Sequence, residues 1–463
     1  MQSLTPLTVA AGICALLCCV RGVTIIRQIQ WIPITVVVGL LLLLETTVAI
    51  PIQDFFPALV DFSVVAKNRA AMSMLIFTTV FAVGQEMMLL AARRKQKHGP
   101  GPAGYDADKL LFFAIAFWTV AMLGHFYFLF LKQNIEFLPT AIKSFGDPDD
   151  HYGYRAYFSK TVYDAGRGQW VSYMAMFLFS PLALVLLSSA YLIRRAHLPA
   201  VLALSLVVVM PFVQIIHGQR SPLVVFAGLV VLCFIYARRG HRLQQILLSK
   251  KLYGYAFAVT ALALFLGAGI YTITDKMEPL EAITMLFNRV FVVPAVTPNF
   301  IYELFPEQFD FRGFRGCFFM HDRHAITSDV TYGDLAIALQ GVSSNVNSCA
   351  VAVGYSGLGY FGAALVSIVI VGMALALDIL LLHEPPILRI AALLISLNSI
   401  QVLASEGLQS AVFSQGYIIC AIIMIVCFRL SRSRTSEFPE HRNFVTGNNV
   451  LTNPVVESLQ RRT

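Results

Sequence analysis

Long apolar runs separated by short polar segments recur along almost the whole chain. About eleven runs have the length of a bilayer-crossing helix, at about 1.5 Å per residue across a core of about 30 Å. They fall at residues 4–20, 31–52, 70–92, 110–131, 169–193, 198–216, 222–237, 252–273, 349–382, 387–404 and 411–428. The pattern predicts an all-α, polytopic integral membrane protein with about 11 transmembrane helices, within a range of roughly 10–14.

The charges between the runs set the expected orientation, because cytoplasmic loops are enriched in Lys and Arg. Alternate loops, starting with residues 21–30, collect basic clusters at 93–97, 194–195, 238–242 and 250–251. The intervening loops carry more acidic than basic residues. We therefore expect the N-terminus outside and the C-terminus in the cytoplasm. The first run has no basic stretch before it, which argues against a cleavable signal peptide.

Composition supports a membrane protein and excludes an ordinary soluble domain. Hydrophobic residues make up 57% and charged residues 13% of the 463 positions, whereas a soluble domain is about a quarter charged. The net charge of +8 is concentrated in the predicted cytoplasmic loops, so we expect the lipid bilayer as a partner and no nucleic acid. Three acids lie within the runs. Glu86 and Asp378 are near cytoplasmic ends and are expected to reach water, whereas Glu45 is the more unusual of the three.

The longest polar segment that is rich in arginine, histidine and acidic residues spans residues 274–348 and divides the chain. Residues 1–273 form an N-terminal transmembrane bundle with an outer loop at 132–168, residues 349–430 form the C-terminal helices, and residues 431–463 form a tail expected to be disordered. Within the large outer loop, residues 279–293 predict an amphipathic helix lying in the membrane interface, broken by Pro294 and Pro298. Gly354, Gly357 and Gly359 at the start of the next run permit close packing or a break.

Arginine is the prominent chemical group of the outer segments. Its planar fork binds phosphate through two parallel hydrogen bonds and keeps its charge. Arg289, Arg312 and Arg315 lie in the large loop, and Arg220 lies in a tight turn between two runs. Each also has a simpler interpretation. Arg220 can extend to water or lipid headgroups as a membrane-surface anchor, and Arg289 can pair with polar residues of its own helix. Arg312 and Arg315 can be solvated loop charges.

Other outer residues complete the set of candidates. A base for a hydroxyl acceptor is offered by His321, His324 and Glu406, which are otherwise surface histidines and a helix-end carboxylate. Asn345 and Asn347 are either helix caps or sugar contacts. The remaining candidates for substrate contact are Arg155, Arg167, His217 and Tyr355. No metal site is expected, because a pair of histidines three residues apart without further ligands is a weak signal.

Three short motifs, in order around the large loop, resemble the Wzy-type O-antigen and repeat-unit polymerases. They are Gly218-Gln219-Arg220-Ser221-Pro222, then Asn288-Arg289-Val290-Phe291-Val292-Val293-Pro294, then Asn345-Val346-Asn347 followed by Tyr355, Gly357, Gly359 and Tyr360. The resemblance covers roughly residues 152–416. It implies a glycosyltransferase C-like fold with a large periplasmic loop, in a multi-pass protein of the bacterial inner membrane.

The resemblance also implies a reaction. The family transfers a growing glycan from undecaprenyl pyrophosphate to a new lipid-linked repeat unit, with no cofactor and no essential metal. Arg220 and Arg289 match the motifs and are the implied pyrophosphate contacts, and a chain-length regulator is an implied partner. An O-antigen ligase, which transfers the same donor to lipid A core, shares this architecture. A transporter or flippase of lipid-linked sugars is the alternative from a different class; it typically carries internal repeats and broken helices.

Overall fold

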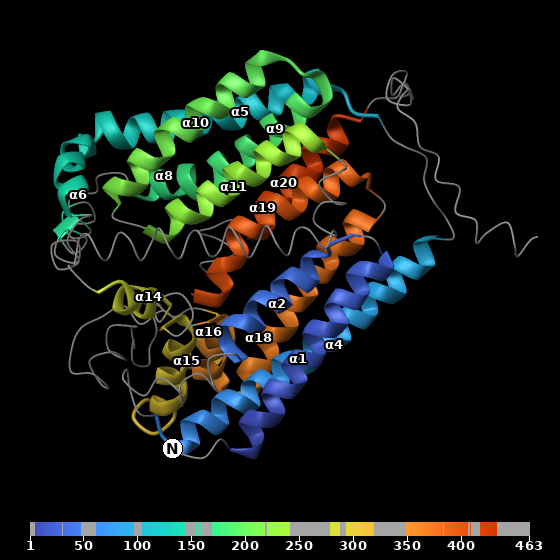
Figure 1. Cartoon of the computed structure of the whole chain (residues 1–463), viewed down its shortest axis with the longest axis vertical. Helices are drawn as coiled ribbons and strands as arrows, with labels where there is room; N and C mark the ends of the chain where they lie inside the picture. The colour runs from blue at the N-terminus through green and yellow to red at the C-terminus, as the bar shows by residue number, and fades with distance from the viewer. Residues whose placement is uncertain are drawn as a thin grey trace, which may run out of the picture.

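The computed structural model describes residues 5–29, 31–47, 62–96, 104–144, 154, 157–158, 161, 169–217, 220–240, 278–287, 293–318, 349–382, 384–405, 408 and 417–432. Over these ranges the secondary structure is helical, and no β-strand forms within them (Figure 1). The all-α class predicted from the apolar runs is confirmed for this part of the chain.

The first of two helix bundles is built around α4. Its members are α1 (Pro6–Ile29), α2 (Ile34–Thr47), α4 (Val64–Gln96) and α18 (Ala350–Leu382). α4 contacts the other three helices, and the buried rings of Phe77 and Phe81 stack at its centre. Because α18 packs directly along α4, the first bundle joins the N-terminal and C-terminal parts of the sequence in one core (Figure 1).

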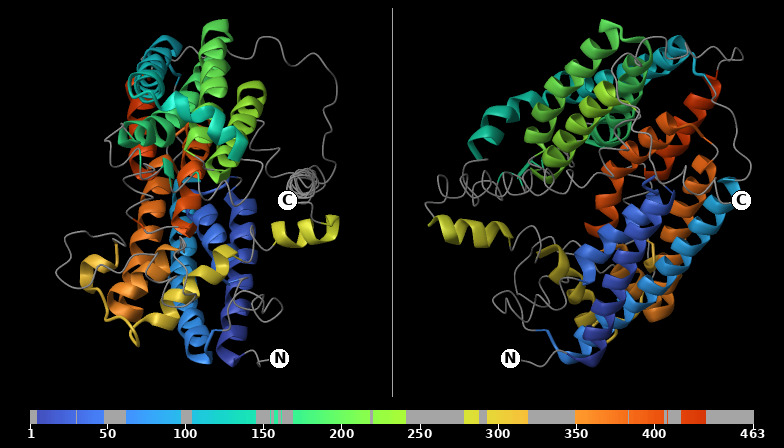
Figure 2. Two further views of the ribbon diagram at one scale, coloured as in Figure 1. Left: turned by 90° about the vertical axis from the view of Figure 1, so that its left-hand side faces the viewer. Right: turned by 45° about the vertical axis from the view of Figure 1, so that its right-hand side comes forward.

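The second bundle surrounds α9, in which every residue from Ser180 to Ala190 is buried. Its members are α5 (Ala107–Phe126), α8 (Gln169–Met174), α9 (Ser180–Arg194), α10 (His197–Ile216) and α11 (Arg220–Arg239). Short elements complete it: η1 (Tyr127–Leu131), η2 (Asn134–Phe137), α6 (Leu138–Ser144) and η3 (Ala175–Phe179). Helix α19 (Pro386–Ser405) contacts both bundles, and α20 (Tyr417–Leu430) packs against α19 (Figure 2).

Six of the described helical segments are long and apolar enough to cross a membrane. They are Pro6–Ile29, Val64–Arg94, Ala107–Leu131, Val171–Arg194, His197–Ile216 and Ala350–Leu382. Shorter apolar helices lie at Ile34–Leu43, Pro386–Leu397 and Ile419–Leu430. Every run predicted from the sequence overlaps a described helix, except the run at 252–273, which lies outside the described residues. The chain is therefore a multi-pass membrane protein.

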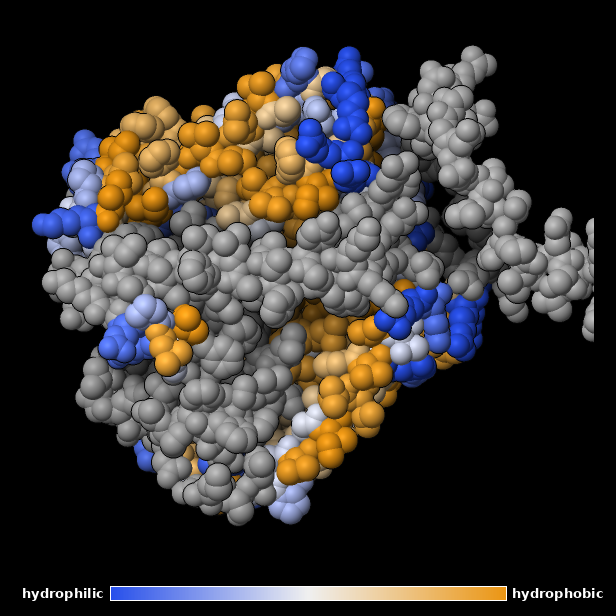
Figure 3. All heavy atoms as spheres, in the orientation of Figure 1, coloured by the Kyte–Doolittle hydropathy of each residue, from blue (hydrophilic) through white to orange (hydrophobic). Residues whose placement is uncertain are grey.

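The surface of the molecule matches this assignment. Apolar side chains such as Leu16, Phe112 and Phe361 are exposed on the outward faces of the bundles, where lipid chains would cover them. Hydrophilic residues gather where α4 and α9 end (Figure 3). We call this the basic end, because the last turns of α9, α11 and α20 carry Arg194, Arg238, Arg239 and Arg429. The opposite end, where α4 and α18 begin and α15 and α16 pack, is the loop end.

The first helix is longer than its apolar run. The sequence predicts that it ends at residue 20, but α1 continues to Ile29 and includes Arg21 and Arg27. Arg is a good helix former, and the Arg21 guanidinium forms a 2.6 Å ion pair with the Glu86 carboxylate of α4. The Glu86 side chain is 51% exposed, which agrees with the expectation that it lies at the surface near a helix end.

The expectation that Asp378 reaches water is wrong. Its side chain is fully buried in α18, and its two carboxylate oxygens accept the backbone N–H groups of Ile34 and Thr35 at 2.8 Å each. These donors belong to the first turn of α2, whose N–H groups have no partner inside their own helix. Asp378 therefore caps α2 from a neighbouring helix, and this pairing compensates for burying the carboxylate.

The large loop contains α14 (Pro279–Phe287), α15 (Val293–Leu304) and the short α16 (Gly313–Gly316). Helix α14 begins at Pro279 as predicted, exposes Leu280 and Ile283, and projects from the body of the molecule (Figure 2). The prediction that Pro294 and Pro298 break the helix is wrong, because both lie within α15. Pro294 occupies the first turn, where its missing N–H costs nothing, and burial of the residues after Pro298 outweighs the single hydrogen bond lost there.

Helix α18 is interrupted near its start, as the glycines allow. Leu358 (φ −139°) and Gly359 (φ 61°) are non-helical and separate residues 350–357 from residues 360–382. The positive φ of Gly359 is easily adopted only without a side chain. The two halves touch through their backbones, since a Cβ on Gly354 would lie 2.7 Å from the carbonyl oxygen of Gly362. Both the break and the close packing predicted from the glycines are present.

Candidate functional site at the loop end

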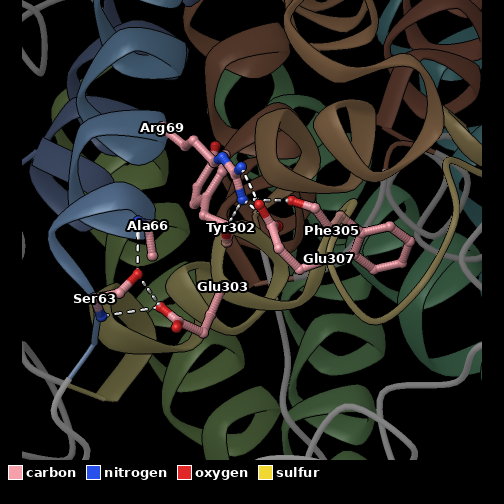
Figure 4. Close-up of polar contacts among 7 residues, drawn as sticks. All are labelled: Ser63, Ala66, Arg69, Tyr302, Glu303, Phe305 and Glu307. Carbon is pink, nitrogen blue, oxygen red and sulfur yellow. Dashed lines mark hydrogen bonds and ion pairs between the residues drawn. The ribbon is translucent and has the colours of Figure 1, made fainter.

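Helices α4 and α15 cap one another at the loop end. Ser63 precedes α4, and its Oγ accepts the backbone N–H of Ala66 at 3.1 Å, which is the usual geometry of a helix N-cap. The Glu303 carboxylate, from the last turn of α15, accepts the backbone N–H of Ser63 at 3.0 Å and its hydroxyl at 2.8 Å (Figure 4). The start of α4 is thus held by the end of α15.

Arg69 completes the junction from the α4 side. Its guanidinium donates to the backbone carbonyls of Tyr302 at 3.2 Å and Phe305 at 3.0 Å, which belong to the C-terminal end of α15 (Figure 4). Carbonyls at a helix C-terminus lack intrahelical partners and favour a cation. The guanidinium also donates through two nitrogens to both oxygens of Glu307. This hydrogen bond from Arg69 holds the pKa of Glu307 below its usual value.

Aromatic rings pack beside this arginine. The ring of Tyr355, in the first half of α18, lies 4.9 Å from that of Tyr302 and 5.3 Å from that of Tyr360. Phe311 meets Tyr355 edge-on at 5.8 Å. Tyr355 and Tyr360 are both close enough to interact electrostatically with Arg69. The loop end therefore combines the Arg69 guanidinium, which is positioned by carbonyls at the end of α15, with tyrosines from both sides of the break in α18.

Helix α16 packs onto that break. The backbone N–H of Arg312 donates to the carbonyl of Ser356 at 3.0 Å, and Cys317 is fully buried against Gly357. A Cβ on Gly357 would lie 2.8 Å from the Cα of Cys317, so the contact requires glycine. Arg312 is 8% exposed, whereas Arg315 is on the exposed surface of α16. The structure thus brings Arg312 and Tyr355, both candidates from the sequence, to the same junction.

Arg69 was missed by the sequence argument. It stands directly before the apolar run at 70–92, in an outer loop that showed no distinctive chemistry. A charged residue there has the same local pattern as any membrane-surface anchor. Its role depends on α15, more than 200 positions away in the sequence, so the local pattern holds no signal for it.

His217 lies elsewhere, inside the second bundle. It is 5% exposed, its Nε2 is 2.8 Å from the Ser172 hydroxyl, and its ring stacks on Phe128 at 4.7 Å. Phe158 and Tyr173 pack against two further sides of the imidazole. The structure does not bring His217 to Arg312 and Tyr355, and its contacts are those of a well-packed core histidine.

The other predicted site residues are outside the part that the structure describes in full. Arg220 begins α11, but only its backbone is described. The remaining predicted residues lie outside the described ranges: Arg155, Arg167, Arg289, His321, Asn345, Asn347 and Glu406. Among the residues that are described, no group of three or more His, Cys, Asp or Glu side chains is placed to hold a metal ion.

The fold and the site define a class: an all-helical, multi-pass membrane protein with an arginine and tyrosine junction at one end of its first bundle. No protein-family model, no curated protein and no solved structure matches this chain.

Proposed function

We propose that the protein polymerises oligosaccharide repeat units carried on undecaprenyl pyrophosphate, at the periplasmic face of the bacterial inner membrane. In this proposal the basic end faces the cytoplasm and the loop end faces the periplasm, following the enrichment of basic residues in cytoplasmic loops. The product is O-antigen or a related surface polysaccharide, and a chain-length regulator is a further partner.

One observation carries the proposal. The segment from Tyr355 to Tyr360, which resembles the polymerase family's motif, forms the break in α18, and Arg312 from the large loop packs on that break. A residue predicted to bind phosphate therefore lies beside a family-like motif, although more than forty positions separate them in the sequence. An arginine and tyrosine site at the end of a membrane-helix bundle suits a substrate with a lipid tail, an anionic group and a sugar.

The chemistry asks for charge stabilisation and proton removal. An acceptor sugar hydroxyl forms a bond to the anomeric carbon of the donor glycan, and the bond from that carbon to the pyrophosphate oxygen breaks. The lipid pyrophosphate leaves with the electron pair, and arginine forks stabilise its growing negative charge. The hydroxyl proton passes to a base, for which His321 and Glu406 are the candidates. Arg220 and Arg289 are the proposed pyrophosphate contacts.

Two alternatives use the same site. A ligase that transfers the glycan to lipid A core would need the same arginines. A transporter of lipid-linked sugars is favoured by the interruption of α18 at Leu358 and Gly359, because transporters commonly bind their substrates at broken helices. The apolar runs show no internal repeat, and internal repeats are typical of many transporters.

The test uses purified protein in lipid with a synthetic undecaprenyl-pyrophosphate-linked repeat unit. We expect a ladder of glycan sizes that is lost in Arg289→Ala and kept in Arg239→Ala, a control at the exposed end of α11. Transfer that occurs only after lipid A core is added would replace the polymerase with a ligase. Uptake or flipping of the lipid-linked unit, with no new glycosidic bond, would replace it with a transporter.

A further inference from the structure

The Arg69 guanidinium is oriented by one set of partners and neutralised by another. The carbonyls of Tyr302 and Phe305 fix its position on the end of α15. Its charge is balanced by Glu307, whose side chain is 51% exposed while that of Arg69 is 17% exposed. The carbonyls are backbone atoms of a packed helix, whereas the carboxylate is a surface side chain just beyond it.

Glu307 is therefore the replaceable partner. Its ion-pair partner, within the part of the chain that the structure describes, is Arg69. A pair with one solvent-exposed member contributes little to stability, because the carboxylate regains water when it leaves. Glu303, the other acid of the junction, is held by Ser63 at the start of α4 and does not need to move. Releasing Glu307 would leave the mutual capping of α4 and α15 in place.

The geometry of the pair also specifies what can replace the carboxylate. Two guanidinium nitrogens meet two carboxylate oxygens in parallel, and phosphate offers the same pair of oxygens with more charge. The tyrosines at positions 355 and 360 interact electrostatically with this arginine, and a tyrosine hydroxyl can donate to a further oxygen of an anion. A monovalent carboxylate is a weaker ligand for this fork than a diphosphate group.

We propose that Arg69 is an anion-exchange site, in which Glu307 occupies the guanidinium at rest and a phosphate or pyrophosphate group of the incoming ligand displaces it. The identification of that ligand as a lipid pyrophosphate rests on the proposed function, whereas the exchange itself does not. Glu307 then acts as an internal competitor that weakens ligand binding and leaves the arginine neutralised when no ligand is present.

The test is a double-mutant cycle on binding by the full-length protein in detergent. The affinity for inorganic pyrophosphate and for farnesyl pyrophosphate is measured by calorimetry in wild type, Glu307→Gln, Arg69→Lys and the double variant. Removing the competitor is expected to tighten binding about two- to fivefold, the size of a partly exposed ion pair. The gain should disappear in the Arg69→Lys background, since lysine offers no fork.

Glu303→Gln is the matched control, because it removes the same charge from the same junction without touching the arginine. If Glu303→Gln and Glu307→Gln tighten binding equally, the gain comes from the loss of one negative charge near the site, and the exchange proposal is overturned. Unchanged or weaker binding in Glu307→Gln, with both variants folded by size-exclusion chromatography, would also overturn it. Tightening with both probes identifies the phosphate group alone as the ligand, and tightening only with the prenyl probe identifies the lipid form.

The outcome is separable from that of the glycan ladder. If Glu307→Gln tightens pyrophosphate binding but the wild type forms no glycan ladder, the polymerase proposal is refuted and the anion site at Arg69 is retained. A glycan ladder together with a pyrophosphate affinity that does not change in Glu307→Gln would support the polymerase proposal and refute the exchange proposal.

Discussion

The buried carboxylate of Asp378 gives the sharpest test of how the first bundle is held together. It lies in α18 and accepts two backbone N–H groups of α2, from Ile34 and Thr35, at 2.8 Å each. Replacing it with alanine removes the only part of the side chain that reaches these donors. The site is fully buried, so bulk water does not take over as the acceptor.

The expected loss of stability follows from these contacts. Loss of an N-cap costs about 1 kcal/mol, and each N–H left buried without an acceptor costs about 1–3 kcal/mol. Against this, the variant no longer has to bury a charge, which returns part of the loss. We therefore expect Asp378→Ala to destabilise the protein by about 2–4 kcal/mol. Asp378→Asn should lose about half as much, because its amide oxygen serves one donor while its NH₂ group faces the other.

The measurement is reversible unfolding in mixed detergent micelles, followed by thermal melting of the same preparations. Glu86→Gln is the control, since Glu86 is also a carboxylate within a membrane helix but its side chain is half exposed and pairs with Arg21. Its substitution should shift stability by less than about 1 kcal/mol. An Asp378→Ala variant that unfolds within about 0.5 kcal/mol of the wild type, the range of a neutral surface change, would show that Asp378 does not stabilise α2 as a cap.

Two further outcomes follow from the structure. At the basic end, the buried Glu384 carboxylate forms ion pairs with Arg429, at 3.0 Å, and with Arg432. Glu384→Gln should lower the free energy of unfolding by about 1–3 kcal/mol, because it leaves two arginines without their carboxylate. The same unfolding experiment measures this loss. An unchanged midpoint would contradict this. Gly357→Ala should lower the melting temperature by several degrees, because the new Cβ would collide with Cys317. Gly228→Ala is the control and should not lower it, because a Cβ on Gly228 would have no atom within 4 Å. Equal effects of the two substitutions would count against the tight contact at Gly357.

The helices of this protein follow closely from the sequence, because the stretch of a helix that faces lipid must be apolar. What the apolar pattern could not provide is where each helix stops. Helix α1 extends past its run to Ile29, since Arg21 is kept in the helix by Glu86, a residue of another helix. Likewise Pro298 remains inside α15, because tertiary packing outweighs the local cost of a proline.

The candidate site was predictable only in part, for the same physical reason. Tyr355 and the glycines around it have a local signature, and they do form the interrupted start of α18. Arg312 was identified by its residue type, which already indicates phosphate chemistry. Arg69 was not, because its significance comes from the carbonyls at the end of α15. Pairings between distant helix ends leave no periodicity in a single sequence.

Capping between different elements explains why the two ends of the first bundle should behave differently. At α2 the cap is a fully buried carboxylate that accepts the backbone N–H groups of Ile34 and Thr35, so nothing outside the protein can compete for it without unfolding the helix. At α15 the cap is Arg69, which holds the helix carbonyls and at the same time pairs with a half-exposed carboxylate. A ligand can therefore replace Glu307 while the helix stays capped.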